Sequence, residues 1–129
     1  MSEPRWLSKA VVLAIHGRLL AEHGGASGIR DEGLLDSALA SPRNHHAHGE
    51  HDIFELAAAY AFSLIHNHPF IDGNKRVAFT CAGVFLEINS ARLIVNEVDA
   101  VQAVLALSTG DLDRGKFATW LRRSSERAS

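Results

Sequence analysis

Nine consecutive residues in the middle of the chain, 68–76 with the sequence HPFIDGNKR, bring together side chains that could do chemistry. His68 is an imidazole, a group that titrates near neutral pH and could take a proton from a hydroxyl group. Asp72 offers a carboxylate for a divalent cation, while Lys75 and Arg76 offer positive charges for an anion. We therefore expect residues 68–76 to form a site for a negatively charged ligand.

The second half of this run coincides with the expected beginning of a helix, at Asn74 or Lys75. A helix N-terminus presents unpaired N–H groups and a partial positive charge, and it therefore binds phosphate. Gly73 can adopt a positive φ angle and so lets the backbone approach a ligand closely. Lys75 and Arg76 oppose the helix dipole in the first turn, a cost that a bound polyphosphate would reverse.

Asp72 and Phe70 complete this interpretation. Asp72 is poorly placed to touch phosphate but well placed to hold Mg²⁺, which is usually bound by one or two carboxylates together with phosphates and waters. Phe70 is expected to turn into the core and fix the loop. A base, a metal ligand and an anion clamp are what phosphoryl or nucleotidyl transfer needs. Taken singly, each residue has a simpler explanation as a cap, a turn or exposed surface, and only the combination favours a site.

Apolar residues recur with helical spacing in most of the remaining chain, which predicts an all-α fold of about six helices. The expected starts of the helices are set by side chains that can cap a helix, and Gly24 and Pro42 are expected to end two of them. The helices are expected at 9–23, 32–40, 52–67, 74–88, 97–109 and about 113–123. Between them we expect an exposed loop or short hairpin at 43–51 and an extended segment at 92–95. A polar, frayed tail at 124–129 should follow.

The bulk composition is that of one globular domain spanning residues 1–129, with a core at about 5–123. The net charge of −2, with ten Arg and three Lys, argues against a general nucleic-acid binder. The single cysteine, Cys81, excludes an internal disulfide, and it is expected to be a buried apolar residue rather than a nucleophile. We find no apolar run of the roughly 20 residues that span a membrane and no leader pattern. A cytoplasmic protein is expected.

Four histidines lie close together at His45, His46, His48 and His51. Such a cluster could bind a transition metal, but its spacing matches no standard zinc pattern and no cysteine or carboxylate set completes it. A solvated segment is the favoured interpretation.

The run 68–76 resembles the signature of the Fic/Doc family, His-x-Phe-x-Asp/Glu-Gly/Ala-Asn-Gly/Lys-Arg. Further stretches resemble its Doc (death-on-curing) branch: Gly28-Ile29-Arg30-Asp31, the Ala-rich helix that runs into His66-Asn67-His68, and Leu86-Glu87-Ile88-Asn89. The resemblance covers about residues 5–123. It implies an all-α Fic fold in which two central helices bracket the active loop.

The resemblance also implies roles for single residues in a reaction that uses ATP and Mg²⁺. His68 would be the general base for a target hydroxyl, Asp72 the Mg²⁺ ligand and Phe70 the structural anchor of the loop. The phosphate cradle would consist of Gly73, Asn74, Lys75 and Arg76. The exposed segment 43–51 would correspond to the flap that holds the target's backbone beside the nucleotide.

Two departures from the family pattern bear on the chemistry. The adenylylating branch usually has Gly where this chain has Lys75, and a second Arg where it has Phe79. Doc-like proteins share the lysine, and they are similar to kinases that move the γ-phosphoryl group to a Thr or Ser of an elongation factor. Gly73, however, follows the wider Fic pattern, so an adenylyltransferase is the alternative. A catalytically silent module that binds nucleotide or antitoxin is a third possibility.

The resemblance further implies a partner antitoxin. Self-inhibiting Fic proteins carry a Ser/Thr-x-x-x-Glu-Gly/Asn helix, and this chain has Asp31 four residues after Ser27 instead of the glutamate. Inhibition is therefore expected in trans, by a small antitoxin whose C-terminal segment folds onto the toxin. No direct nucleic-acid contact is expected except through such a complex, and no membrane contact.

Overall fold

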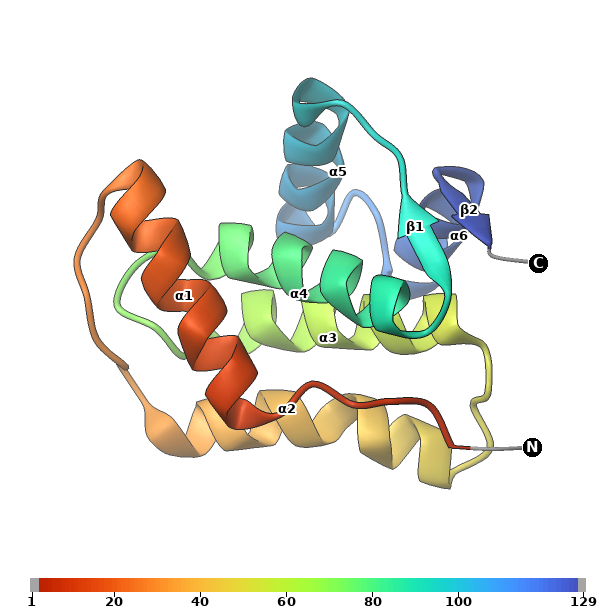
Figure 1. Cartoon of the computed structure of the whole chain (residues 1–129), viewed down its shortest axis with the longest axis horizontal. Coiled ribbons are helices and arrows are strands. Elements are labelled where there is room, and N and C mark those ends of the chain that lie inside the picture. The colour runs from red at the N-terminus through yellow and green to blue at the C-terminus, as the bar shows by residue number, and fades with distance from the viewer. Residues whose placement is uncertain (1–2, 128–129) are drawn as a thin grey trace.

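The computed structural model describes residues 3–127, and in this range it contains six helices and a two-stranded sheet (Figure 1). The expected all-α fold with almost no strand is confirmed. The helices are α1 (Lys9–His23), α2 (Glu32–Ala47), α3 (Ile53–Asn67), α4 (Asn74–Ile88), α5 (Glu97–Thr109) and α6 (Arg114–Arg123), and the strands are β1 (Ala91–Leu93) and β2 (Ser125–Arg127).

Short polar side chains begin five of these helices. Ser8, Asp31 and Asp52 accept hydrogen bonds from backbone N–H groups at the starts of α1, α2 and α3. Asn96 and Asp113 do the same for α5 and α6. Each cap satisfies an N–H group that the helix itself leaves without a partner. The starts of the helices are therefore where the sequence predicted them.

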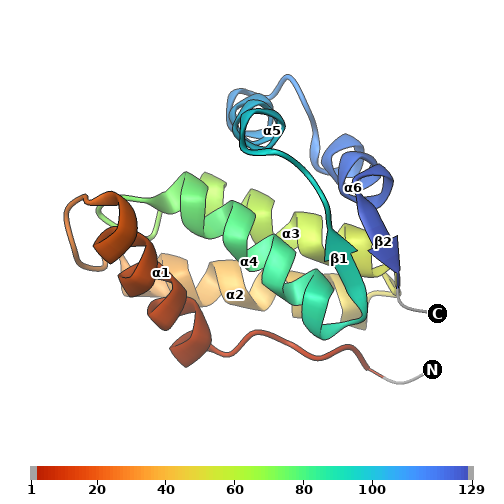
Figure 2. The ribbon, with the colours of Figure 1, turned by 45° about the horizontal axis from the view of Figure 1, so that its top comes forward.

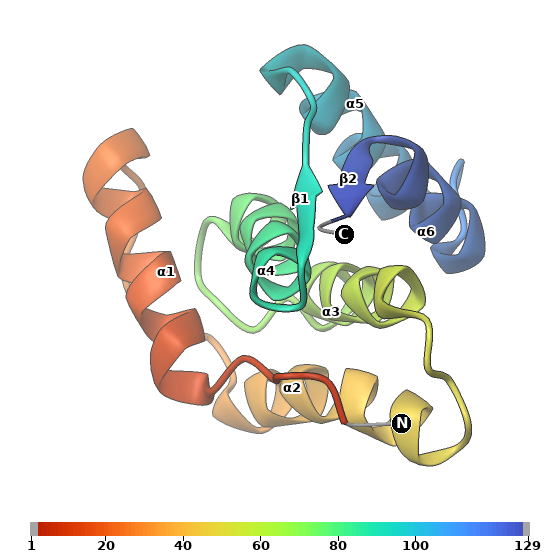
Figure 3. The same cartoon turned by 45° about the vertical axis from the view of Figure 1, so that its right-hand side comes forward.

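Helix α3 lies at the centre of the molecule, with α2 along one side and α4 along the other, while α6 packs on it further along (Figures 2 and 3). Residues 56–61 of α3 are all buried, and four of the six are alanines, so the neighbouring backbones can approach closely. Cys81 of α4 is also fully buried, and burial raises the pKa of its thiol to about 12. It is thus a core residue, as expected, and not a nucleophile.

Pro42 does not end the second helix, contrary to the prediction, because α2 continues to Ala47 with Pro42 inside it. A proline inside a helix lacks the N–H group that would bind the carbonyl four residues earlier, here that of Ala38. The hydroxyl of Ser63 on α3 lies 2.9 Å from this carbonyl oxygen and 2.7 Å from that of Ala59, so its single hydrogen is shared between the two and partly replaces the missing donor. Pro42 itself is buried, so packing against the core also favours the helical position.

The expected loop or hairpin at 43–51 is accordingly wrong for its first half, which is helical, and only residues 48–52 connect α2 to α3. The expected frayed tail is also wrong within the described residues. Ser125–Arg127 form β2, which pairs antiparallel with β1, and the carbonyl oxygen of Ser124 accepts a hydrogen bond from the N–H group of Ile94. Residues 128 and 129 of that tail lie outside the described range. No helix among residues 3–127 is both long and apolar enough to cross a membrane.

The histidine cluster lies at the end of α2 and contacts protein groups. His45 faces the guanidinium of Arg114 at the start of α6, and the ring of His46 packs edge-on against Trp6 and His51. Within residues 3–127, no group of three or more His, Cys, Asp or Glu side chains could hold a metal ion. Burial, and then the charge of Arg114, lower the pKa of His45 below its usual 6.5, while Glu50 acts in the opposite direction.

Acidification should therefore weaken the fold at His45. The folded protein binds a proton there less readily than the unfolded chain, so stability is lost as the pH falls below about 6.5. We expect the urea midpoint of unfolding to decrease between about pH 7.5 and about pH 5.5, and His45→Gln to reduce the decrease. His66→Gln is the control, because that side chain is exposed and is not among the groups that shift the pKa of His45. An unchanged pH dependence in His45→Gln would contradict this assignment.

Candidate active site

The loop between α3 and α4 begins at His68, which ends α3 in the left-handed conformation with φ of 50°. Pro69 follows and cannot continue the helix. The guanidinium of Arg30 donates hydrogen bonds to the carbonyl oxygens of Asn67 and His68, at 2.9 and 2.7 Å. A cation is favourable at a helix C-terminus, so Arg30 holds the backbone that carries His68. The His68 side chain itself is exposed.

Phe70 is fully buried, and the side chain of Asn74 holds its backbone on both sides. The N–H group of Phe70 donates to Asn74 Oδ1 at 3.0 Å, and Asn74 Nδ2 donates to the Phe70 carbonyl oxygen at 2.9 Å. Asn74 is 5% exposed. Its amide group thus closes the loop from inside, so what Asn74 can offer to a phosphate at the start of α4 is its backbone N–H group.

The same amide contacts His68, where Asn74 Nδ2 lies 3.2 Å from Nδ1 of the imidazole. The two bonds to Phe70 fix which end of the Asn74 amide carries the NH₂ group, so this group donates and Nδ1 accepts. The neutral imidazole then carries its hydrogen on Nε2. Nε2 can accept a proton only after that hydrogen moves to Nδ1, which breaks the contact with Asn74.

The carboxylate of Asp72 is held by two backbone N–H groups. Oδ1 accepts from Gly73 at 2.8 Å and Oδ2 accepts from Ala26 at 3.2 Å. Two carboxylate oxygens offer about four acceptor positions, so positions remain for a cation. Asp72 is exposed beside Lys75 and Arg76, and Mg²⁺ needs only one carboxylate when phosphates and waters supply its other ligands. The residues present therefore fit a phosphate-bound Mg²⁺.

The segment between α1 and α2, residues 24–31, lies along this loop. Ile29 forms an antiparallel bridge with Phe70, and the N–H group of Ile71 donates to the carbonyl oxygen of Gly28 at 3.1 Å. The segment 43–51, expected as the flap beside the site, is instead near the opposite end of α3 (Figure 1). The 15 residues of α3 separate the two ends by roughly 20 Å, so that expectation is wrong.

Gly25 is the position at which this segment comes closest to Asp72. A Cβ atom at Gly25 would lie 2.8 Å from Asp72 Oδ2, so Gly25→Ala should displace the carboxylate. Under the expectation that Asp72 holds Mg²⁺ beside a nucleotide, the variant should bind this pair about tenfold more weakly. Gly49→Ala is the matched control, because Gly49 also has a positive φ but no atom within 4 Å of such a Cβ. Calorimetric titration of both variants with ADP and Mg²⁺ measures the difference. An equal loss of affinity in both would contradict it.

A cavity of about 610 Å³ opens over the loop and the start of α4. One wall carries polar groups from His68, Asp72, Lys75 and Arg76, and the opposite wall is an apolar face of α5 that includes Val101 and Leu105. Gly73 begins α4 with φ of 84° and no side-chain cap, so the first N–H groups of the helix remain available to an anion. The cavity thus brings together a candidate base, a candidate metal ligand and a cationic cradle.

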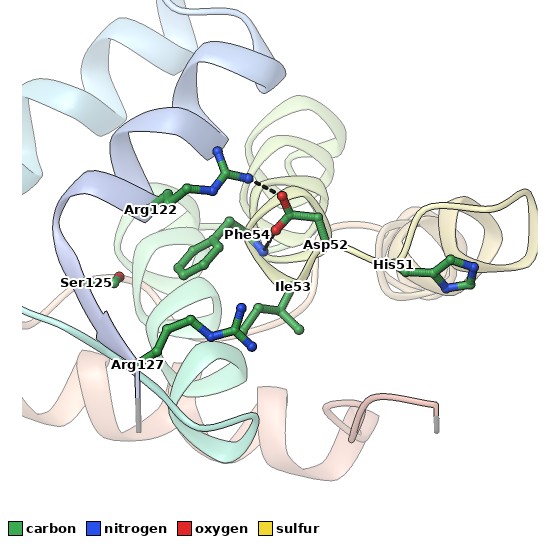
Figure 4. Close-up of a pocket in the computed structure, with 7 residues that line it drawn as sticks. All are labelled: His51, Asp52, Ile53, Phe54, Arg122, Ser125 and Arg127. Atoms are coloured by element: carbon green, nitrogen blue, oxygen red, sulfur yellow. Dashed lines mark hydrogen bonds and ion pairs between the residues drawn. The ribbon is translucent and has the colours of Figure 1, made fainter. Parts of the chain in front are cut away.

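A smaller cavity of about 260 Å³ lies between α3 and α6 (Figure 4). Asp52 pairs there with Arg122, and the guanidinium groups of Arg122 and Arg127 lie 5.3 and 5.9 Å from the centre of the Phe54 ring. Asp52 also caps α3. These side chains contact one another and the start of α3, so we assign no reaction to this cavity.

His16 of α1 is the site residue that the sequence analysis missed. It is buried beneath the loop, where its ring stacks on Phe70 at 3.9 Å and its Nε2 lies 2.9 Å from the Asp72 carbonyl oxygen. The available signal was a histidine one helical turn after Val12 on the apolar side of α1. His66, two residues before His68, stacks on Phe62 and lies outside the cavity.

Comparison with known proteins agrees with this geometry. A family model described as the Fic/DOC family matches residues 6–86, well over half of the chain, and this range includes His16, Gly25 and the whole loop 68–76. A protein of Mycolicibacterium smegmatis named Toxin Doc is 36% identical over 102 residues, which cover 76% of this chain and 78% of that protein. The chain described here therefore belongs to the Fic/Doc family.

Proposed function

We propose that this protein is the toxin of a toxin–antitoxin module and acts as a protein Ser/Thr kinase. The γ-phosphoryl group of ATP would be transferred to a hydroxyl group of a translation elongation factor, of the Tu type, which arrests translation. The name of the relative in Mycolicibacterium smegmatis, Toxin Doc, supports the toxin part of this proposal. The choice of phosphoryl transfer rests on one residue, Lys75.

Lys75 is exposed at the wall of the cavity, in the first turn of α4, and Phe79 lines the same cavity one turn later. The lysine side chain fills space that a glycine would leave for an α-phosphate. Phe79 offers no charge for the terminal phosphate of a nucleotide bound in the adenylylating orientation. Both features favour a reversed nucleotide, with its γ-phosphate at the cradle and towards His68.

In the proposed reaction, the hydroxyl oxygen of the target attacks the γ-phosphorus while the bond to the β,γ-bridging oxygen breaks, and ADP leaves. His68 takes the hydroxyl proton, which requires its Nδ1 to part from Asn74 so that Nε2 is free to accept. Arg76, Lys75 and the N–H groups of the first turn of α4 stabilise the phosphate charge. Asp72 would hold Mg²⁺, which neutralises part of that charge.

Transfer of label distinguishes the two candidate enzymes. With γ-labelled ATP and purified elongation factor, we expect the label to appear on the factor, because the γ-phosphoryl group moves. With α-labelled ATP, we expect no labelled factor. The opposite pattern would assign the protein to the adenylyltransferases, the alternative that Gly73 favours because it follows the wider family pattern.

The proposed antitoxin acts in trans. Within residues 3–127, the structure contains only the helices α1–α6, and the segment 24–31 next to the loop is not helical. In this range, therefore, no additional helix of the self-inhibiting kind covers the cavity. A short reading frame beside this gene, coding for a small antitoxin, would support this proposal. A purified antitoxin should also prevent label transfer when it is added before ATP.

A further inference from the structure

His16 is an unusual residue for the position it occupies. It is 6% exposed, and only three polar residues are buried to this degree among residues 3–127: His16, Ser63 and Asn74. Ser63 bonds carbonyl groups of α2 and α3, and Asn74 bonds within its own loop. His16 alone reaches from α1 across to the loop, over 56 positions of sequence. A buried polar group costs free energy unless it is bonded, so this contact accounts for its burial.

Three sides of the imidazole are in contact with the loop. One face stacks on Phe70, with ring centroids 3.9 Å apart and planes 15° from parallel. Nε2 lies 2.9 Å from the Asp72 carbonyl oxygen, and because a carbonyl can only accept, Nε2 carries the hydrogen. The ring atoms lie 3.7 and 3.8 Å from where a Cβ on Gly73 would be, so the ring borders Gly73 as well.

The carbonyl that His16 holds belongs to the peptide unit between Asp72 and Gly73. The N–H group of that same unit donates to Asp72 Oδ1, so His16 fixes one edge of a peptide plane and the carboxylate binds the other. Gly73 has φ of 84°, a conformation in which glycine meets little steric resistance to rotation. The orientation of the peptide therefore has to be set by its bonds, and the one bond from outside the loop to its carbonyl comes from His16.

We propose that His16 is a positioning residue: its Nε2–H group orients the Asp72–Gly73 peptide so that the Asp72 carboxylate faces the cation while the N–H groups at the start of α4 face the phosphate to which that cation is bound. A residue beyond the metal ligand that orients it typically changes metal affinity by about 10–100-fold. The inference rests on the proposed function only for the identity of the ligand, a nucleotide with Mg²⁺.

The test separates the hydrogen bond from the packing. His16→Phe keeps a ring against Phe70 and loses the donor, whereas His16→Gln loses the ring and keeps an N–H donor at a similar distance from the backbone. We expect His16→Phe to weaken the binding of ADP with Mg²⁺ about tenfold in calorimetry, and His16→Gln to recover most of it. His16→Leu is a second variant without a donor, should His16→Phe not fold. His66→Phe is the control, because His66 also stacks on a ring but does not contact the loop.

A second measurement, on the ligand-free protein, does not depend on the proposed function. The Gly73 amide should exchange its hydrogen about tenfold faster in His16→Phe than in the wild type, and at nearly the wild-type rate in His16→Gln. If neither the wild type nor any His16 variant binds ADP, that result would count against the proposed function. The Gly73 exchange rates would then still test whether His16 orients the Asp72–Gly73 peptide. Unchanged exchange and affinity in His16→Phe, or equal losses in His16→Phe and His16→Gln, would overturn the proposal.

Discussion

Replacing His68 by alanine is expected to lower the rate of phosphoryl transfer by about 10²–10⁴-fold, the usual contribution of a general base. The side chain is exposed at the cavity, so its removal takes away the proposed proton acceptor without opening the core. The measurement is the initial rate of label transfer from γ-labelled ATP, together with growth arrest on expression of the variant. Undiminished growth arrest would exclude both transfer enzymes and favour a catalytically silent binding module.

Two controls make this result specific. His66→Ala removes an exposed histidine two residues away that stacks on Phe62, and it should leave the transfer rate nearly unchanged. His68→Asn tests the backbone, because His68 has φ of 50° and asparagine tolerates this left-handed region better than alanine. A large loss in both His68→Ala and His68→Asn would therefore report the missing imidazole and not a displaced loop.

Replacing Phe70 by alanine is expected to lower the free energy of unfolding by about 3–5 kcal/mol, the typical cost of removing a buried aromatic ring. The ring has no solvent exposure and stacks on His16, so its loss leaves a cavity beneath the loop. In thermal unfolding, we expect the midpoint to fall by roughly 10–20 °C. Urea unfolding followed by circular dichroism measures the free energy directly.

Phe62→Ala is the matched control for this variant. Phe62 is a half-buried phenylalanine of α3 that packs against the edge of the core, and its replacement should cost clearly less than that of Phe70. A Phe70→Ala protein as stable as the wild type would show that the loop does not depend on this ring. Equal costs in both variants would show that the ring contributes no more at Phe70 than at the edge of the core.

The helices could be predicted from the sequence because their signals are local. Asp52, for example, accepts a hydrogen bond from the N–H group of Phe54 only two residues later. Such a cap depends on neighbouring residues in the sequence and not on the rest of the fold. The same holds for the starts of α5 and α6. The apolar stripes then give the buried faces, and α3 is the most buried helix because both α2 and α4 lie along it.

The position of Pro42 inside a helix could not be predicted from local signals. The local preference of this proline is to end a helix. That preference is overridden by tertiary contacts: Pro42 is buried in the core, and the hydroxyl of Ser63, 21 positions later in the sequence, lies beside the Ala38 carbonyl. The polar, histidine-rich stretch after Pro42 indicated exposure correctly for His48 and Gly49, but exposure does not reveal at which end of a helix a segment lies. The flap was therefore assigned to the wrong connection.

The candidate site likewise has one part that could be predicted from the sequence and another that depends on the fold. The run 68–76 could be recognised because its base, carboxylate and cations are consecutive. The residues that hold Asp72 in place are distant in the sequence, because Ala26 and His16 lie 46 and 56 positions before it. A histidine on the apolar face of a helix resembles an ordinary core residue until the fold places a carbonyl in front of it.

The bond between Ser63 and the Ala38 carbonyl has a consequence for how this protein folds. Helix α2 on its own would contain a carbonyl group that its proline cannot satisfy, and the Ser63 hydroxyl comes within hydrogen-bond distance of that group only when α3 has docked. Asn67, one turn further along α3 from Ser63, likewise donates to the Leu34 carbonyl oxygen of α2. The two helices should therefore form and open together as one cooperative unit, and the loop that carries His68 emerges from the end of that unit.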